Sequence, residues 1–208
     1  GKLMITIARA EGVDWDPLKD LTAKAYNILA EDFQLPPVKI FLEKTSPVGA
    51  GLGGGSADAA FALKMLNELC ALELNEGQLA GYASRLGSDC AFFIYNRPMI
   101  GEGRGEVLTE YPVDLEGFDL QVLTPEGISV STKDAYGGIR PHLPEIPLRE
   151  ALSRPVEEWD GILVNDFEET VFVKYPELAA IKRSLYDSGA VYASMPGSGP
   201  ALLALYTK

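Results

Sequence analysis

The residues of this chain with the clearest chemical potential are glycines. Five of them, Gly49, Gly51, Gly53, Gly54 and Gly55, fall within seven consecutive positions. A loop without side chains lets backbone N–H groups converge on one anion, and the positive end of a following helix dipole adds to the attraction. We therefore predict a phosphate-binding loop.

A strand and a helix are expected to position this loop. Residues 38–44 alternate apolar and polar side chains, which indicates a half-buried strand ending at Lys44. Residues 56–70 are apolar nearly all round, which favours a mostly buried helix with Ser56 as its N-cap. Lys44 would add positive charge beside the loop.

Two common phosphate-binding patterns fit the loop poorly. A Walker loop needs a Lys directly after its glycines, and this chain has none there. Gly49, Gly51 and Gly54 match the Rossmann spacing, but the region about 20 residues on, where an acidic strand end is needed, is still predicted helix. A glycine turn that serves only close helix packing is the remaining alternative.

A carboxylate follows the next predicted helix. Asn75 and Gln78 are spaced as a capping box, and the helix runs to about Leu86, where Gly87 is expected to end it in the left-handed conformation. Asp89 comes next, just past the end of this helix, where a carboxylate often serves as a turn residue or a helix cap. Further glycine clusters occur at positions 101, 103 and 105 and at positions 197 and 199.

The remaining patterns predict an α+β protein of two lobes, with a boundary near residues 108–117. The other expected strands are residues 3–8, 120–123, 128–131, 191–195 and 202–206, and the other expected helices are residues 17–33, 148–153, 166–175 and 176–187.

Composition excludes several classes of protein. The 208 residues carry a net charge of -12, which disfavours nucleic acid and anionic membranes as partners. One histidine, His142, cannot build a multi-histidine metal site, and Cys70 and Cys90 suit reduced thiols better than a metal or redox motif. No apolar run reaches about 18 residues. We expect a cytoplasmic protein.

Residues 47–60, PVGAGLGGGSADAA, resemble the second motif of the GHMP kinases, the family of galactokinase, homoserine kinase and mevalonate kinase. Five further segments resemble family motifs in the same order, so that the resemblance extends over residues 18–206. They are LGSD at 86–89, EGRGE at 102–106, ISVST at 128–132, NDFE at 165–168 and MPGSG at 195–199.

The resemblance implies a two-lobed GHMP kinase fold. Residues 1–112 would form an ATP-binding lobe like domain 2 of ribosomal protein S5, and residues 113–208 a ferredoxin-like lobe. The motifs are most like the branch that phosphorylates the 2-hydroxyl of a cytidine diphosphate-linked methylerythritol, using ATP and Mg²⁺. Another GHMP kinase, of the homoserine or mevalonate type, is the alternative. The protein would be a monomer or a homodimer.

The resemblance also implies roles for individual residues. Asp89 would orient or deprotonate the acceptor hydroxyl, and Lys44 would lie at the adenine end of the ATP site, unless it is a solvated strand end. Tyr136, Gly197, Ser198 and Gly199 would bind the substrate, the alternatives being a packing aromatic and a plain tight turn. Ligands for Mg²⁺ are not assigned. The ATP phosphates would be held by Pro47, Val48, Gly49, Ala50, Gly51, Leu52, Gly53, Gly54, Gly55, Ser56 and Ala57.

Two of the departures from the family pattern bear directly on the site. The family's first motif, P-x-A-K-I-N-L followed by G-Y-H, is missing from residues 1–208, so we expect the first lobe to be incomplete at its start. A non-catalytic nucleotide-binding module is the corresponding alternative. Asp20 stands where the family usually has Asn, which is expected to weaken adenine recognition.

Overall fold

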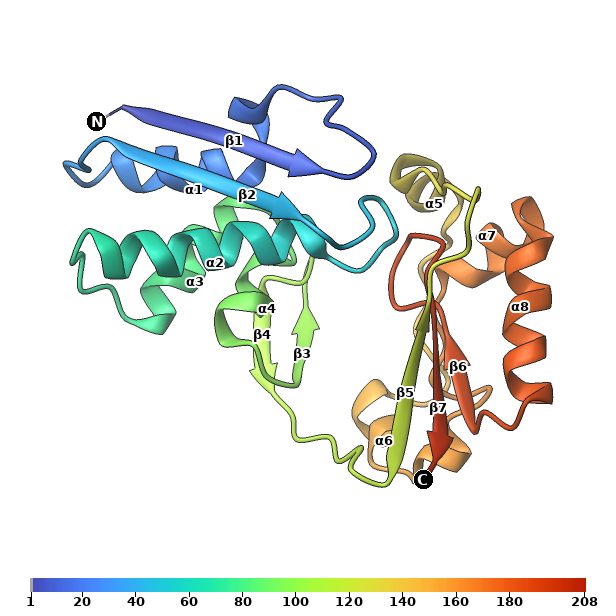
Figure 1. The fold of residues 1–208 in the computed structure, drawn as a ribbon. Helices are drawn as coiled ribbons and strands as arrows, with labels where there is room; N and C mark the ends of the chain where they lie inside the picture. The colour runs from blue at the N-terminus through green and yellow to red at the C-terminus, as the bar shows by residue number, and fades with distance from the viewer. Residues whose placement is uncertain (1) are drawn as a thin grey trace. The chain divides into compact units, whose positions relative to one another are not determined.

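A computed structural model describes residues 2–208 and combines helices with three small sheets, as the α+β prediction requires (Figure 1). Its contacts divide the chain into two compact units. The first runs up to Val48 and resumes over Gly53–Pro112, and the second comprises Gly49–Leu52 and Val113–Lys208. The middle of the glycine loop is therefore grouped with the second unit, although the chain on both sides of it belongs to the first.

The first unit begins with two parallel strands. β1 (Leu3–Arg9) pairs with β2 (Val38–Lys44) from Leu3 opposite Val38 to Arg9 opposite Lys44. Parallel strands need a crossover, which is supplied here by a short 3-10 helix, Pro17–Lys19, and by α1 (Leu21–Ala30). The carboxyl ends of both strands consequently lie together, just before the glycine loop.

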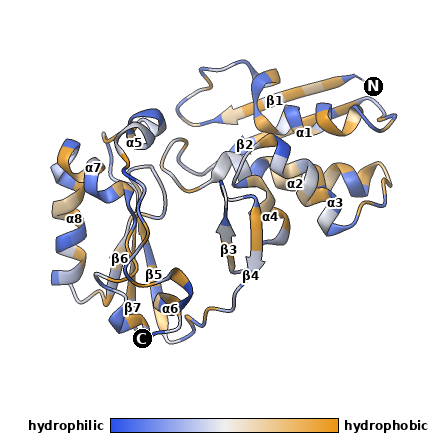
Figure 2. Ribbon diagram, turned by 180° about the vertical axis from the view of Figure 1, so that it is seen from behind, coloured by the Kyte–Doolittle hydropathy of each residue, from blue (hydrophilic) through white to orange (hydrophobic). Residues whose placement is uncertain are grey.

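Three more helices complete the core of this unit. They are α2 (Gly54–Leu69), α3 (Glu76–Leu86) and α4 (Cys90–Tyr95). Leu29, Leu63, Leu66 and Ile94 are fully buried between them and α1. The mostly hydrophobic colouring of α4 in Figure 2 agrees with the burial of Cys90, Ala91 and Ile94. Each buried aliphatic side chain stabilises the unit by roughly 1.5–3 kcal/mol, and together they hold α2 against α1 and α4.

A β-hairpin closes the first unit. β3 (Met99–Glu102) pairs antiparallel with β4 (Val107–Glu110), and the turn between them contains Gly103 and Gly105, both with positive φ. Neither strand is among those expected from the sequence, because glycines interrupt the pattern and each strand is only four residues long.

The second unit contains a three-stranded antiparallel sheet in the order β5 (Phe118–Leu123), β7 (Leu202–Thr207), β6 (Tyr192–Ser194). One face of this sheet packs on α7 (Phe167–Lys174) and α8 (Pro176–Asp187), and the other carries Tyr192 and Leu205 against Trp159. The unit also contains α5 (Thr132–Gly138), α6 (Leu148–Leu152) and a 3-10 helix, Val156–Glu158.

Most expected elements are present, and the differences are local. The strand at residues 38–44, the capping box of Asn75 with Gln78 and the bounds of α8 are confirmed. The N-cap of α2 is Gly53, not Ser56, and Gly87 is extended with φ -178, not left-handed. Residues 128–131 form no strand, and α5 follows them instead.

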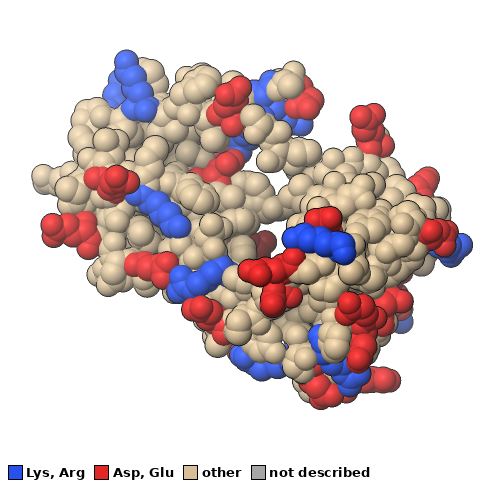
Figure 3. Space-filling view, turned by 60° about the horizontal axis from the view of Figure 1, so that its bottom comes forward, with Lys and Arg blue, Asp and Glu red and all other residues tan. Residues whose placement is uncertain are grey.

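Acidic side chains outnumber basic ones in the sequence, 30 to 18. On the face shown in Figure 3 they are spread over the surface and interleaved with Lys and Arg. Among residues 2–208, no helix is long and apolar enough to cross a bilayer.

Candidate active site

The N-terminus of α2 is suited to receive an anion. Gly53 caps the helix with φ 73 and has no side chain with which to accept the first free N–H groups. The helix is 16 residues long, so a full dipole supports those groups. This is the local geometry that the glycine cluster predicts.

Helix α4 packs directly against this end of α2. A Cβ on Gly53 would lie 2.9 Å from Cζ of Phe93, so only glycine leaves room for that ring. The thiol of Cys90 is hydrogen-bonded to the side chain of Ser56, and burial raises the pKa of this thiol. These two contacts fix the start of α4 beside the start of α2. Phe93 carries no sequence signal beyond its place in an apolar run.

Asp89 is the residue that immediately precedes α4. Its side chain is exposed and makes no capping hydrogen bond to the helix. The turn of the β3–β4 hairpin lies alongside, since a Cβ on Gly105 would be 3.8 Å from Oδ1 of Asp89. A carboxylate that is accessible and close to the α2 N-terminus can act on a hydroxyl brought to a bound phosphate.

Lys44 is held between two carboxylates. Its Nζ lies 2.7 Å from Oδ2 of Asp58 and 3.2 Å from Oδ2 of Asp20, and the side chain is only 8% exposed. Burial disfavours the charged amine, but the bond to Asp58 and the charge of Asp20 outweigh it, so the pKa of Lys44 is raised. Lys44 is therefore no solvated strand end, and its charge is already balanced by neighbours that sequence reasoning did not pair with it.

A second opening lies at the carboxyl ends of β1 and β2. This cavity, about 550 Å³ in volume, is lined by residues including Arg9, Lys44, Thr45, Ser46 and Pro47. It lies in the first unit and borders the start of the glycine loop.

In the second unit, the loop segment Gly49–Leu52 lies against the third glycine cluster. A Cβ on Gly51 would be 2.7 Å from Cα of Gly199, and the backbone N–H of Ala201 donates to the carbonyl of Ala50 at 3.0 Å. Two glycine motifs that are far apart in the sequence are therefore in backbone contact. Ser198 lies between Gly197 and Gly199 and is half-buried.

The third glycine cluster is anchored by the residues that begin α7. Asn165 donates from its Nδ2 to the carbonyls of Met195 (2.8 Å) and Gly197 (2.9 Å). Glu168 accepts the N–H of Met195 at 2.8 Å. The NDFE motif at 165–168 marks this pair in the sequence, although neither residue is a predicted site residue.

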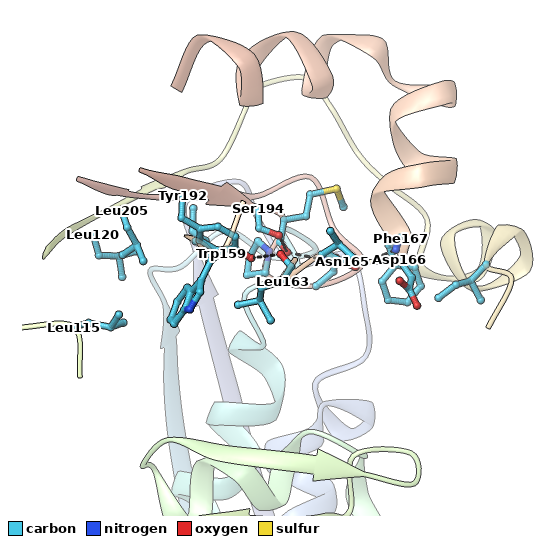
Figure 4. Close-up of a pocket in the computed structure, with 16 residues that line it drawn as sticks. Leu115, Leu120, Trp159, Leu163, Asn165, Asp166, Phe167, Tyr192, Ser194 and Leu205 are labelled. Carbon is cyan, nitrogen blue, oxygen red and sulfur yellow. Dashed lines mark hydrogen bonds between the residues drawn. The ribbon is translucent and has the colours of Figure 1, made fainter. Parts of the chain in front are cut away.

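A cavity of about 660 Å³ opens beside this anchor (Figure 4). Its walls are mainly apolar, with Trp159, Leu163 and Leu205 on one side, and Asn165 with Ser194 forms a polar part. Phe167 also lines it, and Tyr136 stands edge-on to Phe167 with ring centroids 4.9 Å apart. Tyr136 itself is 61% exposed.

Among residues 2–208, no group of three or more His, Cys, Asp or Glu side chains is placed to hold a metal ion.

Two family models match the sequence. The GHMP kinase N-terminal domain matches residues 20–97, and the GHMP kinase C-terminal domain matches residues 148–208. The chain belongs to the GHMP kinase family, and the fold expected from the resemblance is confirmed.

Similarity to curated relatives identifies the branch. The chain is 48% identical over 195 residues to the 4-diphosphocytidyl-2-C-methyl-D-erythritol kinase of Bacteroides fragilis, covering 94% of this chain and 71% of that protein. The kinase of the same name from Cytophaga hutchinsonii is 42% identical over 189 residues, with 90% and 69% covered. The branch suggested by the motifs is thereby confirmed.

Solved structures give a consistent result. A crystal structure of 4-(cytidine 5'-diphospho)-2C-methyl-D-erythritol kinase superposes with a TM-score of 0.75 at 28% identity, covering 99% of this chain and 74% of the other. Homoserine kinase from Cytophaga hutchinsonii superposes with a TM-score of 0.69 at 18% identity, covering 99% and 73%, and shows the shared fold alone.

Proposed function

We propose that this chain transfers the γ-phosphoryl group of ATP to the 2-hydroxyl of 4-diphosphocytidyl-2-C-methyl-D-erythritol. The observation that carries the chemistry is the bare N-terminus of α2 beside the accessible carboxylate of Asp89. The choice of substrate rests on the relatives at 42–48% identity.

The ATP phosphates would lie along residues 47–57 and at the first turn of α2. Backbone N–H groups supply the positive potential there. Side chains do not, because the chain is acidic and the charge of Lys44 is already paired with Asp20 and Asp58. The nucleoside would extend toward the cavity that Thr45 and Ser46 line at the ends of β1 and β2.

In the reaction, the substrate hydroxyl oxygen attacks the γ-phosphorus, the bond from that phosphorus to the bridging oxygen of the β-phosphate breaks, and ADP leaves. Asp89 would accept the hydroxyl proton or orient the hydroxyl. Mg²⁺, when bound to the phosphates, neutralises part of their charge.

The cytidine-linked substrate would use the second unit. Gly197, Ser198 and Gly199 offer a loop held by Asn165, and the adjoining cavity has apolar walls with a polar part, which suits a flat nucleobase and a sugar. Tyr136 with Phe167 offers an aromatic surface at its edge.

A substrate panel tests the proposal. The purified protein is given ATP and Mg²⁺ with the cytidine-linked methylerythritol, homoserine or mevalonate in parallel, and products are followed by mass spectrometry and ADP release. Phosphorylation of the cytidine-linked compound alone is expected. Phosphorylation of homoserine or mevalonate alone would contradict the proposal, and ATP binding without any turnover would indicate a binding module.

A further inference from the structure

Lys44 and Asp58 lie at opposite ends of the glycine loop. Lys44 is the last residue of β2, and Asp58 lies in the second turn of α2. Their side chains meet at 2.7 Å, so one ion pair joins the chain entering the loop to the chain leaving it. All five clustered glycines fall between these two residues.

A third element fixes the position of Lys44. Asp20 caps α1 by accepting the N–H of Thr22 at 2.9 Å, accepts the indole N–H of Trp15 at 3.2 Å, and lies 3.2 Å from Nζ of Lys44. The Trp15 ring centroid is 5.7 Å from the same Nζ. The amine is thus held by β2, α1 and α2 together, away from solvent.

The loop requires such a constraint for a physical reason. Gly49, Gly51 and Gly53 all adopt positive φ, and glycine loses more conformational freedom on ordering than other residues. Bringing the ends of a flexible segment together carries an entropic cost. An ion pair that joins the ends within the folded unit restricts the loop before a ligand arrives.

We propose that Lys44 and Asp58 form an ion-pair clamp across the glycine loop, with Asp20 as the anchor of Lys44, and that this clamp pre-organises the loop for nucleotide phosphates. Lys44 is then a positioning residue that does not itself pair with phosphate. That the ligand is a nucleotide phosphate rests on the proposed function. That the ion pair restricts the loop does not depend on the proposed function.

The substitution Asp58→Ala tests the clamp. Asp58 is partly exposed and alanine favours helix, so the fold is expected to survive. In the nucleotide-free protein, hydrogen–deuterium exchange of residues 45–57 should become faster, while α3 and α8 keep their rates. In turnover, KM for ATP should rise roughly 10-fold, within the range of coupling between contacting residues, with kcat nearly unchanged.

Two matched variants complete the experiment. Asp58→Asn retains an acceptor oxygen without the charge and should give a smaller effect of the same kind. Glu31→Gln breaks an ion pair of 2.6 Å with Arg85 between exposed side chains and should leave the loop unaffected.

The clamp is overturned if Asp58→Ala matches the wild type in both loop exchange and KM for ATP, or if Glu31→Gln changes them equally. A wild type that neither binds nor turns over ATP would overturn the proposed function, yet the exchange comparison without nucleotide would still decide on the clamp.

Discussion

Gly51 and Gly199 approach so closely that a Cβ on Gly51 would lie 2.7 Å from Cα of Gly199. No side chain fits at that distance, and the atoms facing it are backbone, which cannot rotate away. Gly51 also has φ +81, a conformation that other residues adopt at a cost. The second and third glycine motifs therefore need glycine for contact with each other, besides any contact with a ligand.

The substitution Gly199→Ala should separate the two loops. Its Cβ would collide with the backbone of Ala50 and Gly51, so we expect a loss of about 1–3 kcal/mol in the free energy of unfolding, typical of overpacking. KM should rise for both ATP and the alcohol substrate. Urea denaturation and steady-state kinetics measure these effects. Gly117→Ala, in open space in the same unit, is the control, and equal behaviour of the two variants would refute the contact.

Asp89→Asn tests the proposed base. Because Asp89 is exposed and makes no capping bond, the fold should persist, and loss of proton acceptance should lower kcat by roughly 10²–10⁴-fold. KM for ATP should change little. Circular dichroism and single-turnover kinetics separate folding from chemistry. Asp119→Asn, an exposed carboxylate on β5, is the matched control. Near-wild-type turnover by Asp89→Asn would remove Asp89 from the mechanism.

The position of the glycine loop could be predicted from sequence because its determinants are local. A strand pattern, a run of glycines and a helical pattern follow one another, and the structure has β2, the loop and α2 in that order. The helix begins earlier than expected because Gly53, in the left-handed region, caps it and so leaves Ser56 inside the first turn. Ser56 is a good N-cap by type, but its side chain bonds Cys90.

Other features depend on partners distant in sequence. From the sequence, Lys44 is expected to be a free cation beside a phosphate loop. In the structure it is paired with both Asp20 and Asp58. Similarly, the β-branched residues at 128–131 favour a strand, but the three-stranded sheet pairs β5, β7 and β6 without them. Pairing and charge compensation are tertiary properties, and one sequence without alignment carries no direct signal for either.

Asn165 should matter for substrate binding through the loop that it holds. Asn165→Ala removes both donated bonds to Met195 and Gly197 and also the cap on the Phe167 N–H. Asn165→Asp keeps the acceptor for Phe167 but loses the donor. If the donated bonds position Gly197, both variants should raise KM for the alcohol substrate, by roughly 10-fold for about 1–2 kcal/mol of lost hydrogen bonding. A normal KM in Asn165→Asp would assign the residue to helix capping alone.

Asp20 should make the stability of the first unit depend on pH in acid. Burial opposes its ionisation, but the Thr22 N–H and the charge of Lys44 outweigh burial, so its pKa lies below the ordinary 3.8. The folded protein then binds this proton more weakly than the unfolded chain. The stabilisation is complete above the ordinary pKa and is lost as pH falls through the lowered one.

Asp20→Asn keeps an oxygen for the Thr22 N–H and removes the titration, so it isolates this effect. Near neutral pH the variant should be less stable by about 2 kcal/mol, the worth of a hydrogen bond to a charged group, and the difference should shrink below about pH 4. Urea denaturation across this range measures it. Asp16→Asn, which removes an exposed capping carboxylate nearby, is the control. In strong acid Asp20 is protonated, so any stabilisation that comes from its charge must be lost. A stability difference between wild type and Asp20→Asn that stays constant into strong acid would therefore show that the carboxylate charge contributes nothing.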